Sequence, residues 1–354
     1  MGLRRLNVPA LVGRPAMPVL GIEGTAHTIG VGVVEEAEPG RCRILSNERA
    51  MVRPPPPKAG EPGMGIHPRE AANHHAEAGP ALLAAALAKA GVSAEELDGV
   101  AFSQGPGLGP CLRVAATMAR ALALRTGKPL VGVNHCVAHL EIGKGLTGAR
   151  DPLLLYVSGG NTQVLALLRG RYRVFGETLD VGLGNALDKF ARANSIPFPG
   201  GPEIERLARQ AKGPLQPLPY TVKGMDLSFA GTATAAQRLV DDGVPLPDVC
   251  HSFQEHAFAA LVEVSERALA HTGKTELLLG GGVACNARLQ EMSRLMCEER
   301  GVVLHVPPRD VLVDNGAMIA WLGLRKLRAG AATPVAASQV QPYERTDQVE
   351  AVWA

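Results

Sequence analysis

Two histidines stand four positions apart at His135 and His139, directly after an apolar run that predicts a β-strand. Residues four apart on a helix lie on one face, about one turn from each other. Both imidazoles can therefore reach a single cation, which is how helix-borne histidine pairs bind metals. The alternative is that the two rings only pack or form hydrogen bonds. A metal site requires an acidic ligand from elsewhere in the chain. Asp314, at a predicted loop-to-helix junction, is the candidate, and on its own it would simply be a helix N-cap.

A metallopeptidase is disfavoured by the residues around the histidine pair. The His-Glu-x-x-His helix of zinc peptidases carries a glutamate directly after the first histidine as its general base. Here Cys136 occupies that position, and Glu141 comes two residues after the second histidine. The Cys136 side chain leaves the helix about 100° from that of His135, which predicts a packing role.

Length and composition fit a two-lobed globular protein. The chain has 354 residues, of which 46% are hydrophobic and 20% charged, and chains of this length usually exceed one domain. No apolar run approaches the roughly 18 residues of a membrane span, so no membrane association is expected. The net charge of +2 does not mark a nucleic-acid binder. Any RNA contact would come from local patches or partner proteins. Six scattered cysteines without a Cys-x-x-Cys pair favour a reducing cytoplasm.

A strand, a turn of small residues and a second strand are predicted twice, over residues 19–34 and again over 153–167. A third strand is predicted near residues 43–46 and its counterpart near 172–175. Because the same pattern opens both halves, it indicates an internal duplication. Two glycine turns that face each other can cradle a phosphate, since their unshielded N–H groups approach an anion closely.

Between the two predicted hairpins, strands alternate with a glycine loop and a helix over residues 98–133. This alternation is typical of an α/β sheet with crossover connections. Ligands in such sheets collect at the carboxyl ends of strands, which is where the helix of His135 begins. The predicted parts are a disordered extension at 1–16, lobe I at 17–150, lobe II at 151–329, and a tail at 330–354 that packs back on lobe I.

Three turns that enter helices in the second half are candidates for binding a nucleotide. Asp188 follows one of them, and its carboxylate could accept ribose hydroxyls or equally cap its own helix. Gly201 and Glu205 follow the next and are predicted to share one wall. Asn286 ends a glycine loop after a buried strand, where the missing side chains leave room for an adenine ring.

Taken together, these motifs resemble the universal threonylcarbamoyl-adenosine transferase family. The resemblance covers nearly everything from Met17 onward, in order, through the motifs His67–Ala72, Gly105–Arg113, Asn134–Glu141, Tyr156–Gln163, Pro199–Glu205, Tyr220–Asp226, Gly280–Asn286 and Asp314–Ile319. It implies an α/β, two-lobed, duplicated RNase H-like fold of the actin, sugar-kinase and heat-shock chaperone superfamily. His67–Glu70 and Tyr156–Gly160 are most similar to the archaeal and eukaryotic branch, the catalytic subunits of the KEOPS complex.

The resemblance also implies a cofactor, a donor and a reaction. One divalent iron or zinc ion would be held by His135, His139, Tyr156 and Asp314, a nitrogen and oxygen set that suits either metal. Threonylcarbamoyl-adenylate, or an ATP- or ADP-like ligand in its place, would be bound by Tyr156, Val157, Ser158, Gly159, Gly160, Asp188, Gly201, Glu205 and Asn286. The threonylcarbamoyl group would pass to the exocyclic amine of the adenosine beside the anticodon of ANN-decoding tRNAs. No residue stands out as the general base.

The implied partners are tRNA and the other KEOPS subunits, namely a small protein kinase or ATPase, a dimerising subunit and a regulatory subunit. A small-molecule phosphotransferase of the same fold is the main alternative. Such kinases carry a metal-handling aspartate in the first hairpin, and Glu23 stands at that position here. A non-enzymatic scaffold is the other alternative, but a scaffold would have no need of the ligand set.

Overall fold

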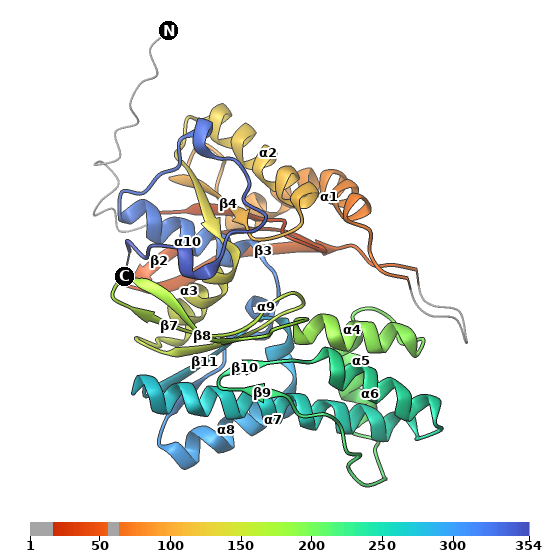
Figure 1. Ribbon diagram of the computed structural model, residues 1–354. Helices are drawn as coiled ribbons and strands as arrows, with labels where there is room; N and C mark the ends of the chain where they lie inside the picture. Colours follow the sequence, from red (N-terminus) through yellow and green to blue (C-terminus); the bar gives the residue numbers. More distant parts are fainter. Residues whose placement is uncertain (1–16, 56–63, 354) are drawn as a thin grey trace.

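Two mixed β-sheets form the framework of the computed structural model, which describes residues 17–55 and 64–353 (Figure 1). The predicted disordered extension at 1–16 lies outside the described residues. The first sheet has the order β3-β2-β1-β4-β5. Its strands are β1 (Val19–Glu23), β2 (Thr28–Glu38), β3 (Arg41–Met51), β4 (Gly99–Gly105) and β5 (Leu130–Asn134). Strands β1 to β3 pair antiparallel, whereas β4 and β5 run parallel to β1.

The second sheet repeats this arrangement, with the order β12-β11-β6-β7-β8. Its strands are β6 (Leu153–Val157), β7 (Thr162–Leu168), β8 (Arg171–Glu177), β11 (Glu276–Gly280) and β12 (Val303–His305). Here β6 to β8 form the antiparallel part, and β11 and β12 run parallel to β6. Strand order and direction therefore match between the halves, which confirms the predicted two-lobed, duplicated α/β fold.

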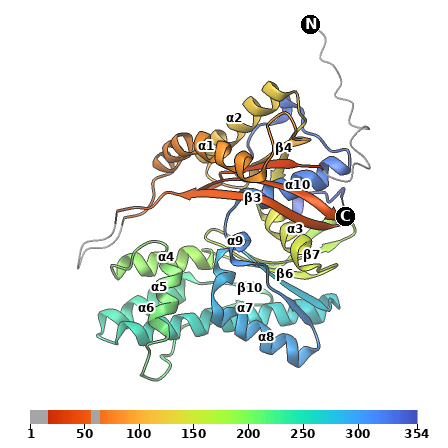
Figure 2. The same ribbon diagram turned by 180° about the vertical axis from the view of Figure 1, so that it is seen from behind.

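The helices lie in three groups (Figures 1 and 2). Helices α1 (Pro68–Ala90) and α2 (Gly109–Thr126) pack together beside the first sheet. Helices α4 (Leu183–Ala193), α5 (Gly200–Ala208), α6 (Ala230–Asp241), α7 (Leu246–Thr272) and α8 (Ala287–Arg300) belong to the second half. The small ribbon of β9 (Val222–Lys223) and β10 (Asp226–Leu227) lies between α5 and α6 in the chain. The short helix η2 (Gly282–Cys285) precedes α8, and the short helix α9 (Arg309–Leu312) follows β12.

The third group, α3 (His135–Thr147) and α10 (Gly316–Arg328), lies between the two sheets (Figure 1). One buried cluster joins these helices to both sheets. It includes Val137 and Leu140 of α3, Ile319 and Trp321 of α10, Val19 and Val131 of the first sheet, and Leu154 and Leu278 of the second. Burial of this apolar surface holds the two halves together.

Helix α10 packs directly on β1 and β2, at glycines. A methyl group on Gly21 would lie 2.1 Å from the backbone nitrogen of Ala320, and one on Gly316 would lie 2.2 Å from that of Gly32. Side chains would prevent such an approach, so the helix and the strands meet backbone to backbone. The domain prediction assigned residues up to 329 to lobe II, whereas the structure places this helix on the first sheet.

The tail after α10 contacts both halves. The Thr333 amide donates to the carbonyl of Leu130 over 2.7 Å, and the Gln341 amide donates to that of Gln104 over 2.7 Å. Farther on, the Ala351 amide donates to the carbonyl of Gly170 over 2.8 Å. The tail therefore follows the first sheet and then ends on the β7–β8 hairpin of the second.

Across the described part of the chain, no helix combines the length and the apolar character needed to cross a bilayer.

Candidate functional site

His135 and His139 begin helix α3 at the carboxyl end of β5, where the sequence places them. The helix starts there because Asn134 caps it, its side chain accepting a hydrogen bond from the Val137 amide over 3.1 Å. Both imidazoles are buried, and their ring centroids lie 4.9 Å apart. The strand end and the cap together direct the two rings toward one point.

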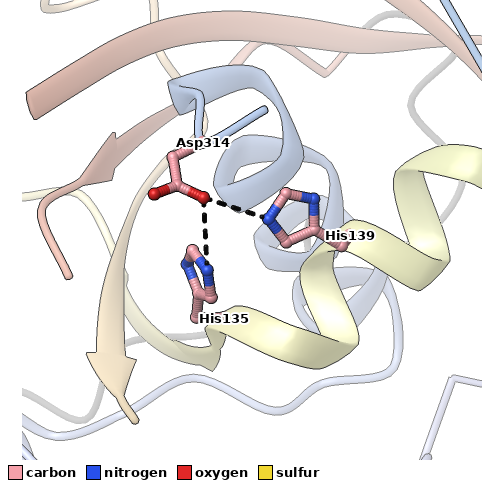
Figure 3. A group of neighbouring side chains, drawn as sticks. All are labelled: His135, His139 and Asp314. Carbon is pink, nitrogen blue, oxygen red and sulfur yellow. Dashed lines mark hydrogen bonds and ion pairs between the residues drawn. The ribbon is translucent and has the colours of Figure 1, made fainter. Parts of the chain in front are cut away.

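Asp314 completes this group from the loop before α10 (Figure 3). Its Oδ1 lies 3.3 Å from Nε2 of His139 and 3.5 Å from Nε2 of His135. The alternative role as N-cap is filled by Asn315, whose side chain accepts from the Met318 amide over 2.9 Å. One ligand atom from each of the three residues lies within 4.8 Å of the others, so a single metal ion could contact all three.

Tyr156 in β6 lies beside the cluster, with its ring centroid 5.3 Å from that of His139. The side chain is fully buried, and its Oη has no hydrogen-bond partner among the described residues. A buried polar atom without a partner is costly and calls for a specific explanation. A phenol oxygen next to two imidazoles and a carboxylate fits a fourth ligand, and this donor set suits iron or zinc.

Glu23 supports the cluster from the end of β1, a role that the sequence analysis missed. Its Oε2 lies 3.0 Å from Nδ1 of His135. Its Oε1 accepts hydrogen bonds from the amide of Thr25 over 2.7 Å and from its hydroxyl over 2.6 Å. A carboxylate on Nδ1 fixes the histidine tautomer and leaves Nε2 free to bind a metal.

The charges of the cluster oppose the effect of burial. Burial alone would lower the pKa of His135, but Glu23 and Asp314 raise it to about 9. Burial lowers the pKa of His139, despite the hydrogen bond with Asp314. Burial would raise the pKa of Asp314, but the two histidines hold it below its ordinary value. The cluster therefore keeps an ionised carboxylate against the imidazoles, and a metal ion would displace the proton on His135.

Replacing Glu23 with glutamine is expected to weaken metal binding about 10- to 100-fold, the usual effect of losing a carboxylate behind a metal-bound histidine. Glutamine preserves the shape of the side chain but not its charge. The affinity of the metal-free protein for zinc would be measured by competition with a chelator. Glu35→Gln, a change of another buried acid on the neighbouring β2, is the control. An unchanged affinity in Glu23→Gln would contradict the role of this carboxylate.

The turn that follows Tyr156 lies against the start of α4. Val157 ends β6, and the carbonyl of Ser158 accepts from the amide of Gly184 over 3.1 Å. A methyl group on Gly160 would meet nothing within 4 Å. The turn predicted to bind the donor phosphate is therefore fixed to a helix N-terminus on one side and open on the other.

Asp188 lies in the middle of α4 and caps the following helix. Its Oδ1 accepts from the amide of Gly200 over 2.7 Å, at the start of α5. The alternative that it caps its own helix is wrong, because Gly182 is the N-cap of α4. Burial raises the pKa of Asp188, against the bond from Gly200.

Gly201, Glu205 and Asn286 lie along the neighbouring helix starts. A methyl group on Gly201 would meet nothing within 4 Å. Oε1 of Glu205 accepts from the amide of Ala287 over 3.1 Å, which ties α5 to the start of α8. Asn286 caps α8 through its side-chain oxygen and donates its amide to Gln254 over 2.9 Å. The residues of the second half that are predicted to bind the acyl donor are thus linked through α5. Asp188, Glu205 and Asn286 each also accept a hydrogen bond from a backbone amide.

Comparison with known proteins gives one consistent result. The family described as tRNA N6-adenosine threonylcarbamoyltransferase matches residues 57–321. Relatives with this name from Thermococcus kodakarensis and Archaeoglobus fulgidus are each 56% identical over 95% of this chain and 100% of their own length. A probable bifunctional tRNA threonylcarbamoyladenosine biosynthesis protein from Methanocorpusculum labreanum is 55% identical, and the chain spans 61% of its length.

Solved structures of low sequence identity share the fold. HypF from T. kodakarensis has a TM-score of 0.59 at 13% identity, over 89% of this chain and 48% of its own. The activator of 2-hydroxyisocaproyl-CoA dehydratase from Clostridium difficile has a TM-score of 0.51 at 12% identity, over 89% and 97%. These similarities concern the fold alone.

Proposed function

Because this chain belongs to the tRNA N6-adenosine threonylcarbamoyltransferase family, we propose that it is the enzyme that transfers the threonylcarbamoyl group to an adenosine of tRNA. The adenosine is the one beside the anticodon in ANN-decoding tRNAs. The observation that carries this proposal is that Asp314, from a distant part of the chain, meets the neighbouring His135 and His139 at one point. A scaffold would not need this set, and a kinase of the same fold does not require it.

The cluster is proposed to hold one iron or zinc ion, with Tyr156 as the fourth protein ligand. When bound, such a cation would polarise the carbonyl group of the acyl donor. Burial raises the pKa of Tyr156 well above its ordinary value, so its hydroxyl keeps its proton in the protein without metal. The role of His135, His139 and Asp314 is to place this charge beside the turn that follows Tyr156.

The donor is proposed to be threonylcarbamoyl-adenylate, and ATP or ADP would occupy the same place. Val157, Ser158, Gly159 and Gly160 would hold its phosphate at the start of α4, as helix N-termini favour anions. Asp188 and Glu205 would accept the ribose hydroxyls, and Gly201 and Asn286 would border the adenine. The amine of the tRNA adenosine attacks the carbamoyl carbon, the new carbon–nitrogen bond forms, and the carbon–oxygen bond to the phosphate breaks to release AMP.

Partner proteins are proposed to supply much of the tRNA affinity, because the net charge is only +2. Two longer relatives, of which this chain covers 61% and 60%, are named probable bifunctional tRNA threonylcarbamoyladenosine biosynthesis proteins. Their additional sequence supports the proposal that this protein acts together with a second protein. The proposed partners are the KEOPS kinase, dimerising and regulatory subunits. A cytoplasmic location is proposed from the six cysteines, all of them free.

The direct test combines the purified protein, its partner subunits, separately synthesised threonylcarbamoyl-adenylate and an ANN-decoding tRNA. Mass spectrometry of the digested tRNA would detect the modified nucleoside, and tRNA without an adenosine beside the anticodon is the control. Product on the first tRNA alone is the expected result. A folded, metal-loaded protein with its partners that forms no product would overturn the proposal and favour the phosphotransferase.

Replacing Asp188 with alanine is expected to raise the KM for the donor about tenfold, with a smaller effect on kcat. Oδ1 is used by Gly200, which leaves the other oxygen for a ribose hydroxyl, and one hydrogen bond to a charged group contributes about 1.5 kcal/mol. Steady-state kinetics with varied donor would measure the change. Glu203→Ala, a change of a partly exposed acid in the first turn of α5, is the control. Equal KM values for the two variants would contradict the assignment.

A further inference from the structure

We propose that His27 is the general base of the transfer reaction and accepts the proton that the tRNA amine loses as it attacks the carbamoyl carbon. This inference rests on the function proposed above. It assigns the one chemical role for which neither the sequence motifs nor the metal cluster supplies a residue.

His27 lies in the turn between β1 and β2, and hydrogen bonds from other elements fix this turn. The amide of Val52 donates to the carbonyl of His27 over 3.0 Å. The amide of Gly24 donates to the hydroxyl of Ser103 over 3.0 Å, and that of Leu108 donates to the carbonyl of Thr25 over 2.7 Å. A side chain on a backbone held at three points keeps a defined position, as a catalytic group requires.

The turn connects the metal cluster with the donor residues of the second half. Thr25, two residues before His27, has its hydroxyl 3.3 Å from Nδ1 of His135 and shares the carboxylate of Glu23 with it. On the other side, the His27 ring contacts the Phe198 ring edge to face, with centroids 5.3 Å apart. Phe198 lies two residues before Gly200, which binds Asp188. The His27 ring is also close enough to Asp314 of the cluster and to Asp188 of the proposed ribose site for both carboxylates to act on its pKa.

The imidazole of His27 is available as a proton acceptor. Burial lowers the pKa of His27 more than Asp314 and Asp188 raise it, and His75 is also close enough to interact with it. The ring is thus neutral at physiological pH. Among the described residues, neither ring nitrogen has a hydrogen-bond partner that would occupy it.

The other acids of the site are already engaged. Glu23 binds Thr25 and His135, and Asp314 lies between the two histidines. Asp188 holds Gly200, and Glu205 holds Ala287. A general base must also accept a proton without loss of the site's structure, and His27 meets this condition without breaking a hydrogen bond.

The step balances without an additional reactant. The nitrogen of the tRNA amine forms a bond to the carbamoyl carbon, and its proton passes to a ring nitrogen of His27. The carbon–oxygen bond to the adenylate phosphate breaks, and its electron pair leaves with AMP. The imidazolium then returns its proton to water.

The test compares wild type, His27→Ala and His27→Gln in single-turnover reactions with saturating donor, over a range of pH. The rate of His27→Ala is expected to fall about 100-fold, at the lower end of the usual contribution of a general base. Added imidazole should restore part of the activity of His27→Ala but not of His27→Gln, whose side chain fills the space. The wild-type rate should decline at acid pH, below the ordinary histidine range, and this decline should be absent from both variants.

Metal content and melting temperature of each variant show that the site and the fold are intact. His251→Ala, a change of a partly exposed histidine on α7, is the matched control and should keep the wild-type rate. An active wild type whose His27→Ala variant keeps at least a third of its rate would overturn the role of His27. The role of His27 would also be overturned if the rate of His27→Ala fell, imidazole did not restore it, and the variant kept the wild-type pH profile. An inactive wild type would instead overturn the proposed function.

Discussion

The Asp314→Ala protein is expected to lose its metal and about 1,000-fold of its tRNA-modifying activity. Oδ1 of Asp314 lies 3.5 Å from Nε2 of His135 and 3.3 Å from Nε2 of His139, so this carboxylate oxygen faces both rings. Removal of this carboxylate leaves two imidazoles and a phenol, too few strong ligands to retain a divalent ion. In the proposed mechanism the bound cation would polarise the acyl carbonyl, so its loss would remove several kcal/mol of transition-state stabilisation, and about 4 kcal/mol corresponds to a factor of 1,000.

Metal content measured by mass spectrometry and activity measured on tRNA should fall together in this variant. Asp310→Ala, four residues earlier in α9 and exposed, is the matched control and should keep both. Because the carboxylate also balances the charge of His135, thermal unfolding would show whether the fold survives its removal. A variant that keeps its metal, or one that loses it without loss of activity, would refute the proposed centre.

Replacing Gly21 with alanine is expected to lower the free energy of unfolding by about 3 kcal/mol or more, the upper range for an overfilled core. The added methyl group would lie 2.1 Å from the nitrogen of Ala320 and 2.5 Å from the carbonyl oxygen of Gly316. These are backbone atoms of α10 and cannot move aside as a flexible side chain could. The helix has to shift away from β1, and Asp314, two residues before it, has to shift with it.

Urea unfolding of the metal-free protein would measure this loss, and zinc titration would show a weaker site in the same variant. Gly231→Ala in α6 is the control, because a methyl group there meets nothing within 4 Å. Alanine at a free helical position should raise stability by about 0.5–1 kcal/mol. Equal stability of the Gly21→Ala and wild-type proteins would mean that α10 does not pack on β1 as described.

Local patterns predicted much of this fold. Alternating apolar runs around small-residue turns predicted both hairpins and therefore the duplication. Site residues were predictable where they lie on one element, as His135 and His139 do, four positions apart on one helix. They were not predictable where two distant elements meet. Glu23 reaches His135 across 112 positions, and only the pairing of β1 with β4 and of β4 with β5 brings the two together.

The position of α10 and the role of Asp188 also differ from the sequence-based expectation, again because elements distant in sequence meet. An apolar helix such as α10 can cover either sheet, and the glycines of β1 and β2 that admit it are not adjacent to it in sequence. The capping role of Asp188 depends on α5, which begins twelve residues later. Helical periodicity describes which face of a helix is buried but not what covers it.

The position of α10 on β1 and β2 also determines the order in which the protein can be completed during translation. The glycine-lined face of the first sheet is made at the beginning of the chain, whereas its covering helix follows roughly 300 residues later. At about 5–20 residues per second, a ribosome needs about 15–60 s to cover that interval. Throughout this time the first half lacks both its cover and the carboxylate of Asp314. The proposed metal centre can therefore form only once nearly the whole polypeptide has been made, and a product that ends before Asp314 would lack one of its three clustered ligands.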